Sequence, residues 1–167
     1  MSRAGAVALA LAALALAAPA AFAAPPEVGV LVPGESLGGV RLGWSLAGVE
    51  RLWGATSGRC RACTVETRYF NRVSFQPEGA AVELRRGRVV SVFTLWAPRR
   101  WHTDRNVYVG EPERRVQTAH GAARRVRCQG YDGLVLRESR AAQTVVYTVD
   151  GTVWGFGLLA TGERVCR

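Results

Sequence analysis

A stretch of this sequence punctuated by glycine occurs twice, and the recurrence limits the folds that the chain can adopt. The first copy, Gly39–Gly54, reads GVRLGWSLAGVERLWG and aligns without a gap with Asn106–Gly121. The matched positions are Val40 with Val107, Leu42 with Val109, Gly43 with Gly110, Val49 with Val116, Gly54 with Gly121 and Ala55 with Ala122. Further on, Ala81–Leu95 resembles Val145–Leu159. Two matches in the same order favour a tandem duplication with units of about 60 residues.

Each copy has the features of a short helix. In the first copy, apolar residues recur at helical spacing, namely Leu46, Val49, Leu52 and Trp53. Ser45 is a suitable N-cap and Gly54 a suitable residue to end the helix. In the second copy, Pro112 falls near the first helical turn and Gly121 follows the last. We therefore predict one short helix in each copy.

Strands are predicted after each helix. One covers Tyr69–Gln76, and two more flank the turn Arg86-Gly87. In the second half, Leu134–Glu138 precedes a hairpin around Asp150-Gly151, a pair that is typical of two-residue turns because both positions favour positive φ. The expected fold class is α+β: two tandem helix-plus-antiparallel-meander repeats, with short helices packed on one face of a sheet.

The beginning of the chain is typical of a secretory signal peptide. Residues 1–23 combine Arg3, a nearly unbroken Ala/Leu run and the cleavage pattern Ala21-Phe22-Ala23. An uncleaved membrane anchor is the alternative, whereas cleavage would leave no stable anchor. We then expect a first α+β repeat over residues 24–97, a linker over 98–105 and a second repeat over 106–167. The expected location is outside the cytoplasm, secreted or associated with the cell envelope.

The repeat also resembles known families. The residues that carry the resemblance are Val40, Leu42, Gly43, Ser45, Val49, Gly54, Gly87, Arg88 and Val89. The pattern resembles the SmpA/OmlA-type outer-membrane assembly proteins, the tandem repeat of the beta-lactamase inhibitory proteins, and exported proteins of high-GC actinobacteria. The resemblance implies a non-enzymatic role in protein binding or at the envelope. The chain lacks the lipobox cysteine of the assembly proteins, and no inhibitory contact residue can be transferred.

The chain is basic and arginine-rich, with a formal net charge of +9 and no lysine. The codon bias of a GC-rich genome accounts for arginine in place of lysine. The charge also favours an anionic partner, such as an envelope polymer or an acidic protein. Nucleic acid is not expected as a partner, because the arginines are spread along the chain without a recognisable binding motif.

The four cysteines Cys60, Cys63, Cys128 and Cys166 all follow the signal peptide, which indicates two disulfides. We favour Cys60–Cys63 with Cys128–Cys166. The alternative pairs Cys60 with Cys128, since they occupy similar places in the two copies. The CxxC spacing also permits a redox role, although neither an adjacent tryptophan nor a βαβ unit accompanies it. A zinc site is not expected, because Cys128 and Cys166 stand singly.

Other candidates for catalysis are weak. His102 lies close to Asp104 in the sequence, which permits a His–Asp pair, but no nucleophile signature accompanies it. His120 aligns with Trp53 at a helix end, where packing or compensation of the helix dipole is the simpler role. We predict no catalytic residue, metal or cofactor.

Three aromatic residues near the second turn have two interpretations. If Tyr147 pairs with Trp154 and Val145 with Phe156, the three aromatic side chains share one face, but alignment with the first hairpin puts them on the open face. A slip of one residue exchanges the two faces. Tyr147, Trp154 and Phe156 are therefore either core residues or the candidate site for a partner.

Three hypotheses about function follow. The first is an exported, disulfide-stabilised, non-enzymatic binding protein that contacts a protein or an anionic envelope component through its open sheet face. The second is a small secreted enzyme, a thiol-disulfide enzyme or a hydrolase, centred on Cys60/Cys63 or His102. The third is a basic protein that adheres to the envelope through its arginines.

Overall fold

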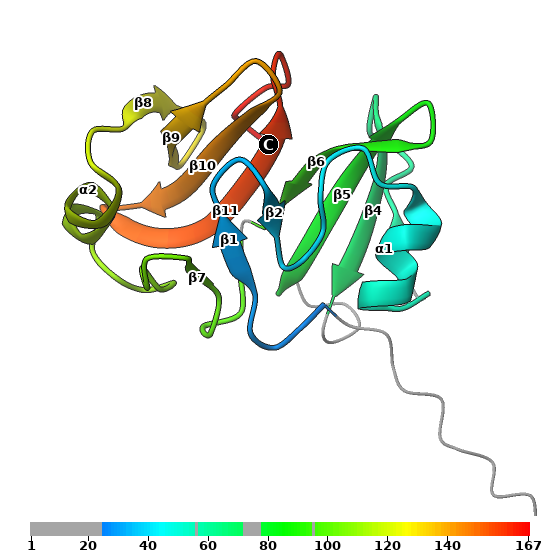
Figure 1. The fold of residues 1–167 in the computed structure, drawn as a ribbon, viewed down its shortest axis with the longest axis horizontal. Helices are drawn as coiled ribbons and strands as arrows, with labels where there is room; N and C mark the ends of the chain where they lie inside the picture. Colours follow the sequence, from blue (N-terminus) through cyan, green and yellow to red (C-terminus); the bar gives the residue numbers. More distant parts are fainter. Residues whose placement is uncertain (1–24, 56, 72–77, 95) are drawn as a thin grey trace, which may run out of the picture.

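The computed structural model describes residues 25–55, 57–71, 78–94 and 96–167 (Figure 1). The strands are β1 (Val30–Val32), β2 (Ser36–Leu37), β3 (Gly58–Arg59), β4 (Glu66–Asn71), β5 (Gly79–Arg85), β6 (Arg88–Phe93), β7 (His102–Thr103), β8 (Arg124–Arg127), β9 (Asp132–Glu138), β10 (Ala142–Val149) and β11 (Thr152–Ala160). The helices are α1 (Leu46–Trp53) and α2 (Glu113–His120). Within the described ranges, neither helix is long and apolar enough to cross a lipid bilayer.

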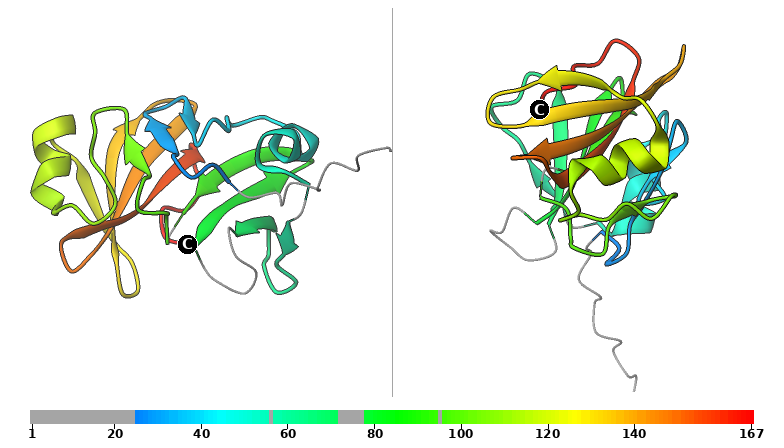
Figure 2. Two further views of the ribbon diagram at one scale, coloured as in Figure 1. Left: turned by 90° about the horizontal axis from the view of Figure 1, so that it is seen from below. Right: turned by 90° about the vertical axis from the view of Figure 1, so that its left-hand side faces the viewer.

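Eight strands form one antiparallel sheet in the order β3-β4-β5-β6-β11-β10-β9-β8. Its centre is the pairing of β6 with β11, where Phe93 lies opposite Gly157 and Ser91 opposite Leu159. This pairing joins parts of the chain that are far apart in the sequence. The two sheet edges are β3 and β8, and the helices lie at opposite ends of the molecule (Figure 1 and Figure 2).

A second, three-stranded sheet has the order β2-β1-β7. In it β1 runs antiparallel to β2 and parallel to β7, with Leu31 opposite both Leu37 and Thr103. Leu31 and Leu37 are buried in the same apolar cluster as Phe156 and Leu158 of the large sheet. The Gly34 amide donates a hydrogen bond to Thr144 Oγ1 at 2.8 Å. The small sheet therefore packs against one face of the large one.

The expected fold class, two tandem helix-plus-meander repeats of α+β type, is wrong. The described chain is mostly β, with two helices of eight residues each. The meanders do not form separate units, because β6 pairs with β11 and makes one continuous eight-stranded sheet. The second sheet contains Val30–Val32 and Ser36–Leu37, which we assigned to no element. Its third strand, His102–Thr103, lies in the predicted linker. The expected boundaries of the signal peptide, linker and repeats stay predictions, and residues 1–23 lie outside the described residues.

The two helices form where the sequence predicts them. Ser45 caps α1 by accepting a hydrogen bond from the Gly48 amide, and Pro112 occupies the N-cap of α2. From α1, Trp53 packs edge-on against Phe70 and Trp101, with ring centroids 5.4 and 6.4 Å apart. The helix α1 thereby covers the face of the sheet that carries Phe70.

Both hairpins have the expected tight turn, followed by an irregularity that the sequence did not predict. The turn residues have positive φ, 51° and 71° at Arg86-Gly87 and 48° and 73° at Asp150-Gly151. The register then shifts between Glu83 and Leu84, and between Tyr147 and Thr148. Each bulge inserts one residue into the returning strand, so residues beyond it exchange faces. Consequently Phe93 does not lie on the face of Val82 and Leu84, on which a hairpin without a bulge would place it.

Two predicted strands have different limits in the structure. The strand β4 begins at Glu66, before the predicted Tyr69, and residues 72–76 of that prediction lie outside the described residues. The strand predicted over Leu134–Glu138 is β9, which begins two residues earlier at Asp132.

Candidate functional site

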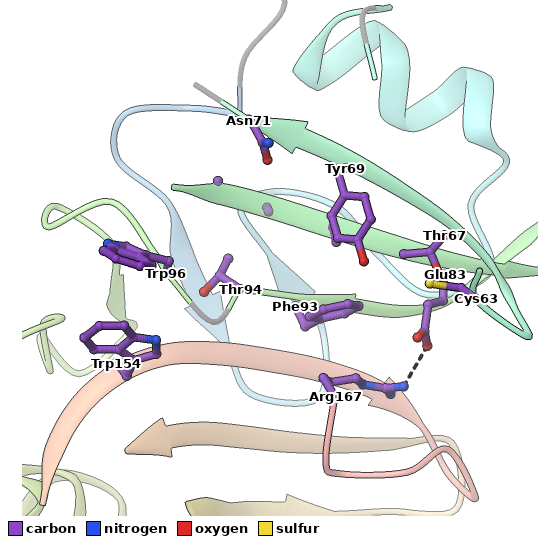
Figure 3. A pocket seen from close by; sticks show the side chains of 13 residues that line it. Cys63, Thr67, Tyr69, Asn71, Glu83, Phe93, Thr94, Trp96, Trp154 and Arg167 are labelled. Atoms are coloured by element: carbon purple, nitrogen blue, oxygen red, sulfur yellow. Dashed lines mark hydrogen bonds and ion pairs between the residues drawn. The ribbon is translucent and has the colours of Figure 1, made fainter. Parts of the chain in front are cut away.

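A groove of about 590 Å³ lies on the face of β4, β5 and β6 opposite α1. Because side chains alternate along a strand, Ala80 and Val82 join the core beneath α1 while Ala81 and Glu83 face the groove. Beyond the bulge in β6, Phe93 also faces the groove and pairs with Ala81. Figure 3 shows the groove with tryptophans at one end and charged groups at the other.

Four aromatic side chains line the groove: Tyr69, Phe93, Trp96 and Trp154. Trp96 and Trp154 contact each other at one end, with ring centroids 5.2 Å apart and ring planes inclined by 48°. Tyr69 projects from β4 beside Phe93 (Figure 3). Trp96 is 51% exposed and Tyr69 37% exposed, and two large exposed side chains that line one groove are more informative than either alone. The groove therefore presents apolar surface to solvent.

The opposite end of the groove carries a buried ion pair. Arg167 Nη1 lies 2.7 Å from Glu83 Oε2, and the two side chains are only 8% and 13% exposed. Arg167 also donates from Nη2 to Ser91 Oγ at 2.9 Å, and its guanidinium lies over the Phe93 ring. Its Nε–H is buried and has no hydrogen-bond partner among the described residues.

The last residues of the chain hold Arg167 in place. Cys166 is bonded to Cys128, and the amide and carbonyl of Arg167 both hydrogen-bond the Tyr131 hydroxyl. Just before them, Val165 accepts a hydrogen bond from the Tyr147 hydroxyl at 2.9 Å. Burial raises the pKa of Tyr147 far above its ordinary value, although the charge of Arg167 opposes that rise. The terminal segment thus covers the sheet beside the groove and places the guanidinium at its end.

The candidate partner-binding residues Tyr147, Trp154 and Phe156 do not form one surface. Tyr147 and Phe156 have no exposed surface and belong to two different apolar clusters. The bulge separates their faces, because Tyr147 pairs with Gly155, and Val146 rather than Val145 pairs with Phe156. Two of the three are therefore core residues, and an exposed patch of all three does not exist. Trp154 alone lines the groove.

The disulfides are Cys60–Cys63 and Cys128–Cys166, the pairing that we favoured over Cys60 with Cys128. The chain is accordingly disulfide-stabilised. Cys63 lines the groove at the end near Glu83 (Figure 3). Since both members of the CxxC pair are bonded, neither is a thiolate in this structure, and a redox reaction would have to begin with an incoming thiol.

The two histidines lie apart from the groove residues. His102 stacks on Tyr108 with ring centroids 4.7 Å apart, and its Nδ1 lies 3.2 Å from the Arg100 carbonyl oxygen. The carboxylate of Asp104, which we considered as a partner for His102, favours a higher pKa of His120. Burial lowers the pKa of His120 despite that carboxylate, and its Nε2 lies 2.8 Å from Thr103 Oγ1.

Sequence reasoning missed Tyr69, Phe93, Trp96 and Arg167 as candidate site residues. Trp96 lies in a segment without helical or strand periodicity, so the sequence does not indicate which residues it contacts. Phe93 reaches the groove through the bulge in β6, which leaves no clear mark in the sequence. The signal that could have drawn attention to Arg167 is its position next to Cys166, because a disulfide fixes the residues beside it.

Comparison with known proteins adds a likeness of fold. No protein-family model matches the sequence. No curated protein matches it either. The structure is similar to the 1.5 Å crystal structure of an extracellular protein containing an SCP domain from Bacillus anthracis str. Ames, with a TM-score of 0.50 and 10% sequence identity. The similarity covers 72% of this chain and 44% of that one, so the chain spans less than half of its structural neighbour. At this identity the likeness concerns the fold alone.

Proposed function

We propose that this chain is an exported, non-enzymatic binding protein and that the groove is its binding site. The observation that carries the proposal is the aromatic wall, in which Trp96 and Tyr69 remain substantially exposed beside Phe93 and Trp154. Exposed apolar surface of this kind is typical of binding sites, because covering it releases water. The ligand is a component of the cell envelope or of the surrounding medium that offers an apolar group.

Export is part of the proposal. The sequence of residues 1–23 is typical of a signal peptide, and disulfides persist mainly in oxidising compartments. The structural neighbour is itself described as extracellular. Mass spectrometry of the protein recovered outside the cytoplasm tests this point, since cleavage after Ala23 would give a chain that begins at Ala24.

The binding function is tested by capture from the envelope and the culture medium of the producing cell. Wild-type protein is compared with the double variant Trp96→Ala/Trp154→Ala, and with Tyr108→Ala as a matched control. Tyr108 is an exposed aromatic residue outside the groove lining. We expect a component that the wild type and the control retain and the double variant loses. Equal recovery by all three would contradict a role for the groove.

Binding through surface arginines predicts a different result. A component held by charge alone is released as the salt concentration rises, and it is held equally by the wild type and the tryptophan variants. Repeating the capture over a range of salt concentrations therefore separates the groove from general adhesion to anionic polymers.

A further inference from the structure

The size and the walls of the groove indicate what kind of ligand fits it. Its volume of about 590 Å³ lies within the roughly 300–1,000 Å³ of small-molecule sites in proteins. The floor is made of the small side chain of Ala81 and the ring of Phe93, with Trp154 at one end. A flat apolar body can lie along this floor and contact the tryptophan ring. The apolar part of the ligand is therefore flat and no larger than a few fused or linked rings.

Arg167 adds an unused hydrogen-bond donor at the other end. Its two terminal nitrogens contact Glu83 and Ser91, whereas Nε has no partner among the described residues although the side chain is more than nine-tenths buried. A buried donor without a partner is uncommon in folded proteins, and an acceptor atom on a ligand would satisfy it. Nε has almost no solvent-accessible surface in this structure, so a ligand acceptor reaches it only when the guanidinium turns toward the groove, which Arg167 and Glu83 both line.

Glu83 determines which charge a ligand group can carry at this end of the groove. Its carboxylate already neutralises Arg167 at 2.7 Å, so the ion pair as a whole offers no net positive charge. A ligand carboxylate at this end would face the Glu83 carboxylate, and like charges in a partly buried site repel strongly. An uncharged amide has an oxygen that accepts from Arg167 and an N–H that donates to the second oxygen of Glu83.

We infer that the groove binds a small molecule with a flat apolar body and an uncharged amide-type polar group, the body against Phe93 and Trp154 and the polar group at Arg167 and Glu83. This inference rests on the binding function proposed above. The ligand is a free small molecule because the groove has the volume of a small-molecule site; a polypeptide segment with an aromatic side chain is the competing occupant.

Three probes with the same ring system test the preference. They are 2-naphthamide, 2-naphthoate and 2-methylnaphthalene, which end in an amide, a carboxylate and a methyl group. Binding is followed by NMR of the indole N–H signals of Trp96 and Trp154 in the full secreted chain. We expect the amide to bind at least about tenfold more tightly than the carboxylate, with the methyl compound between them. Equal affinities, or tighter binding of the carboxylate, would overturn the inference.

Two variants address the polar end separately. Glu83→Gln frees the charge of Arg167, so we expect the carboxylate to bind at least about tenfold more tightly than it does to the wild type. Arg167→Lys keeps a positive charge near Glu83 but removes the planar guanidinium and its Nε, so the advantage of the amide over the methyl compound should decrease. Glu66→Gln is the matched control, because Glu66 pairs with Arg68 on the same sheet but outside the groove lining. Unchanged preferences in both variants would contradict the assigned role of the ion pair.

Further probes separate a wrong ligand class from a wrong function. The blocked peptide acetyl-Gly-Trp-Gly-amide carries an aromatic side chain and uncharged amides within a polypeptide. If it shifts the tryptophan signals and 2-naphthamide does not, the occupant is a polypeptide: the inference fails and the binding function stands. If no probe shifts these signals and the capture experiment also shows no dependence on Trp96 and Trp154, both proposals fail.

Discussion

The hairpins β5–β6 and β10–β11 have the same backbone arrangement, but the surface of the first is open and that of the second is covered. Each has a two-residue turn with positive φ followed by a bulge at the same distance from that turn. At the bulge the first hairpin carries Glu83 and the second carries Tyr147. Tyr147 is covered by Val165 and has no exposed surface, whereas Glu83 lines the open groove. The side chains and the covering terminal segment, rather than the backbone, therefore determine which half of the sheet is closed.

The largest expected effect comes from removing a large buried side chain from the closed side, the covered surface of β10–β11. Tyr147→Ala removes a fully buried ring and leaves a cavity, so we expect a loss of roughly 3–5 kcal/mol in the free energy of unfolding. Tyr69→Ala on the open side should cost about 1 kcal/mol or less, because Tyr69 is already exposed. Urea unfolding of the two variants measures the contrast. Similar losses in both would show that the open side is packed as tightly as the closed side.

Removing the Cys128–Cys166 disulfide, which holds the terminal segment over Tyr147, should have the next largest effect. The double variant Cys128→Ser/Cys166→Ser opens a loop with a sequence separation of 38, and we expect it to lose about 3–4 kcal/mol. It should also bind a dye specific for apolar surface, since the terminal segment no longer covers Tyr147. The matched double variant Cys60→Ser/Cys63→Ser opens a much shorter loop and should lose about 2 kcal/mol or less. Thermal unfolding with intact disulfides in the reference protein checks the order of the two losses.

A smaller effect is expected where the closed side leaves no space for a methyl group. A Cβ atom at Gly157 would lie 2.9 Å from the Tyr147 hydroxyl oxygen and within 3.2 Å of ring carbons, so Gly157→Ala should cost roughly 1–3 kcal/mol. Tyr147→Phe removes the nearest of these atoms. In a double-mutant cycle the two substitutions should therefore cost less together than the sum of their separate effects. Strict additivity would indicate that Gly157 is required for another reason.

The smallest expected effect concerns the ends of the two helices. At the end of α1, Trp53 is buried among other aromatic rings, while α2 ends in the titratable His120. Because burial holds the pKa of His120 below its ordinary 6.5 in the folded state, the unfolded chain takes up a proton first as the pH falls. Stability should thus decrease by less than about 1 kcal/mol as the pH drops from above to below 6.5.

The variant His120→Gln provides the comparison for that titration. It should remove this part of the pH dependence while leaving any contribution from the carboxylates. Melting temperatures of both proteins between pH 8 and pH 5 measure the difference. A steeper loss of stability in the variant than in the wild type would contradict the expected direction.

Local elements could be predicted from the sequence because their causes are local. Ser45 and Gly54 define the ends of α1, and the turn at Asp150-Gly151 depends on two adjacent residues with positive φ. The bulges could not be predicted, since inserting Val90 or Trp154 depends on how each strand packs rather than on its own pattern. A regular register, such as Tyr147 opposite Trp154, therefore does not hold beyond each bulge.

Long-range pairing explains the other differences. The fold class was wrong because nothing in the sequence of β6 indicates that β11, far along the chain, is its neighbour. The candidate site depends on the same pairing, which brings Trp154 and Arg167 to the face that carries Phe93. Sequence reasoning placed the site on the sheet face without a helix, as proposed here, but of its three residues only Trp154 lines the groove.

The two edges of the eight-stranded sheet affect how molecules of this protein behave toward one another. An open edge strand can accept a strand from a second molecule and so begin aggregation. Here β8 has the sequence RRVR, in which Arg125 is held by Glu113 and Asp132, and β3 consists of two residues beside the Cys60–Cys63 disulfide. Charge at one edge and shortness at the other oppose edge-to-edge polymerisation. Some of the arginines thus oppose strand addition at the edge of the sheet.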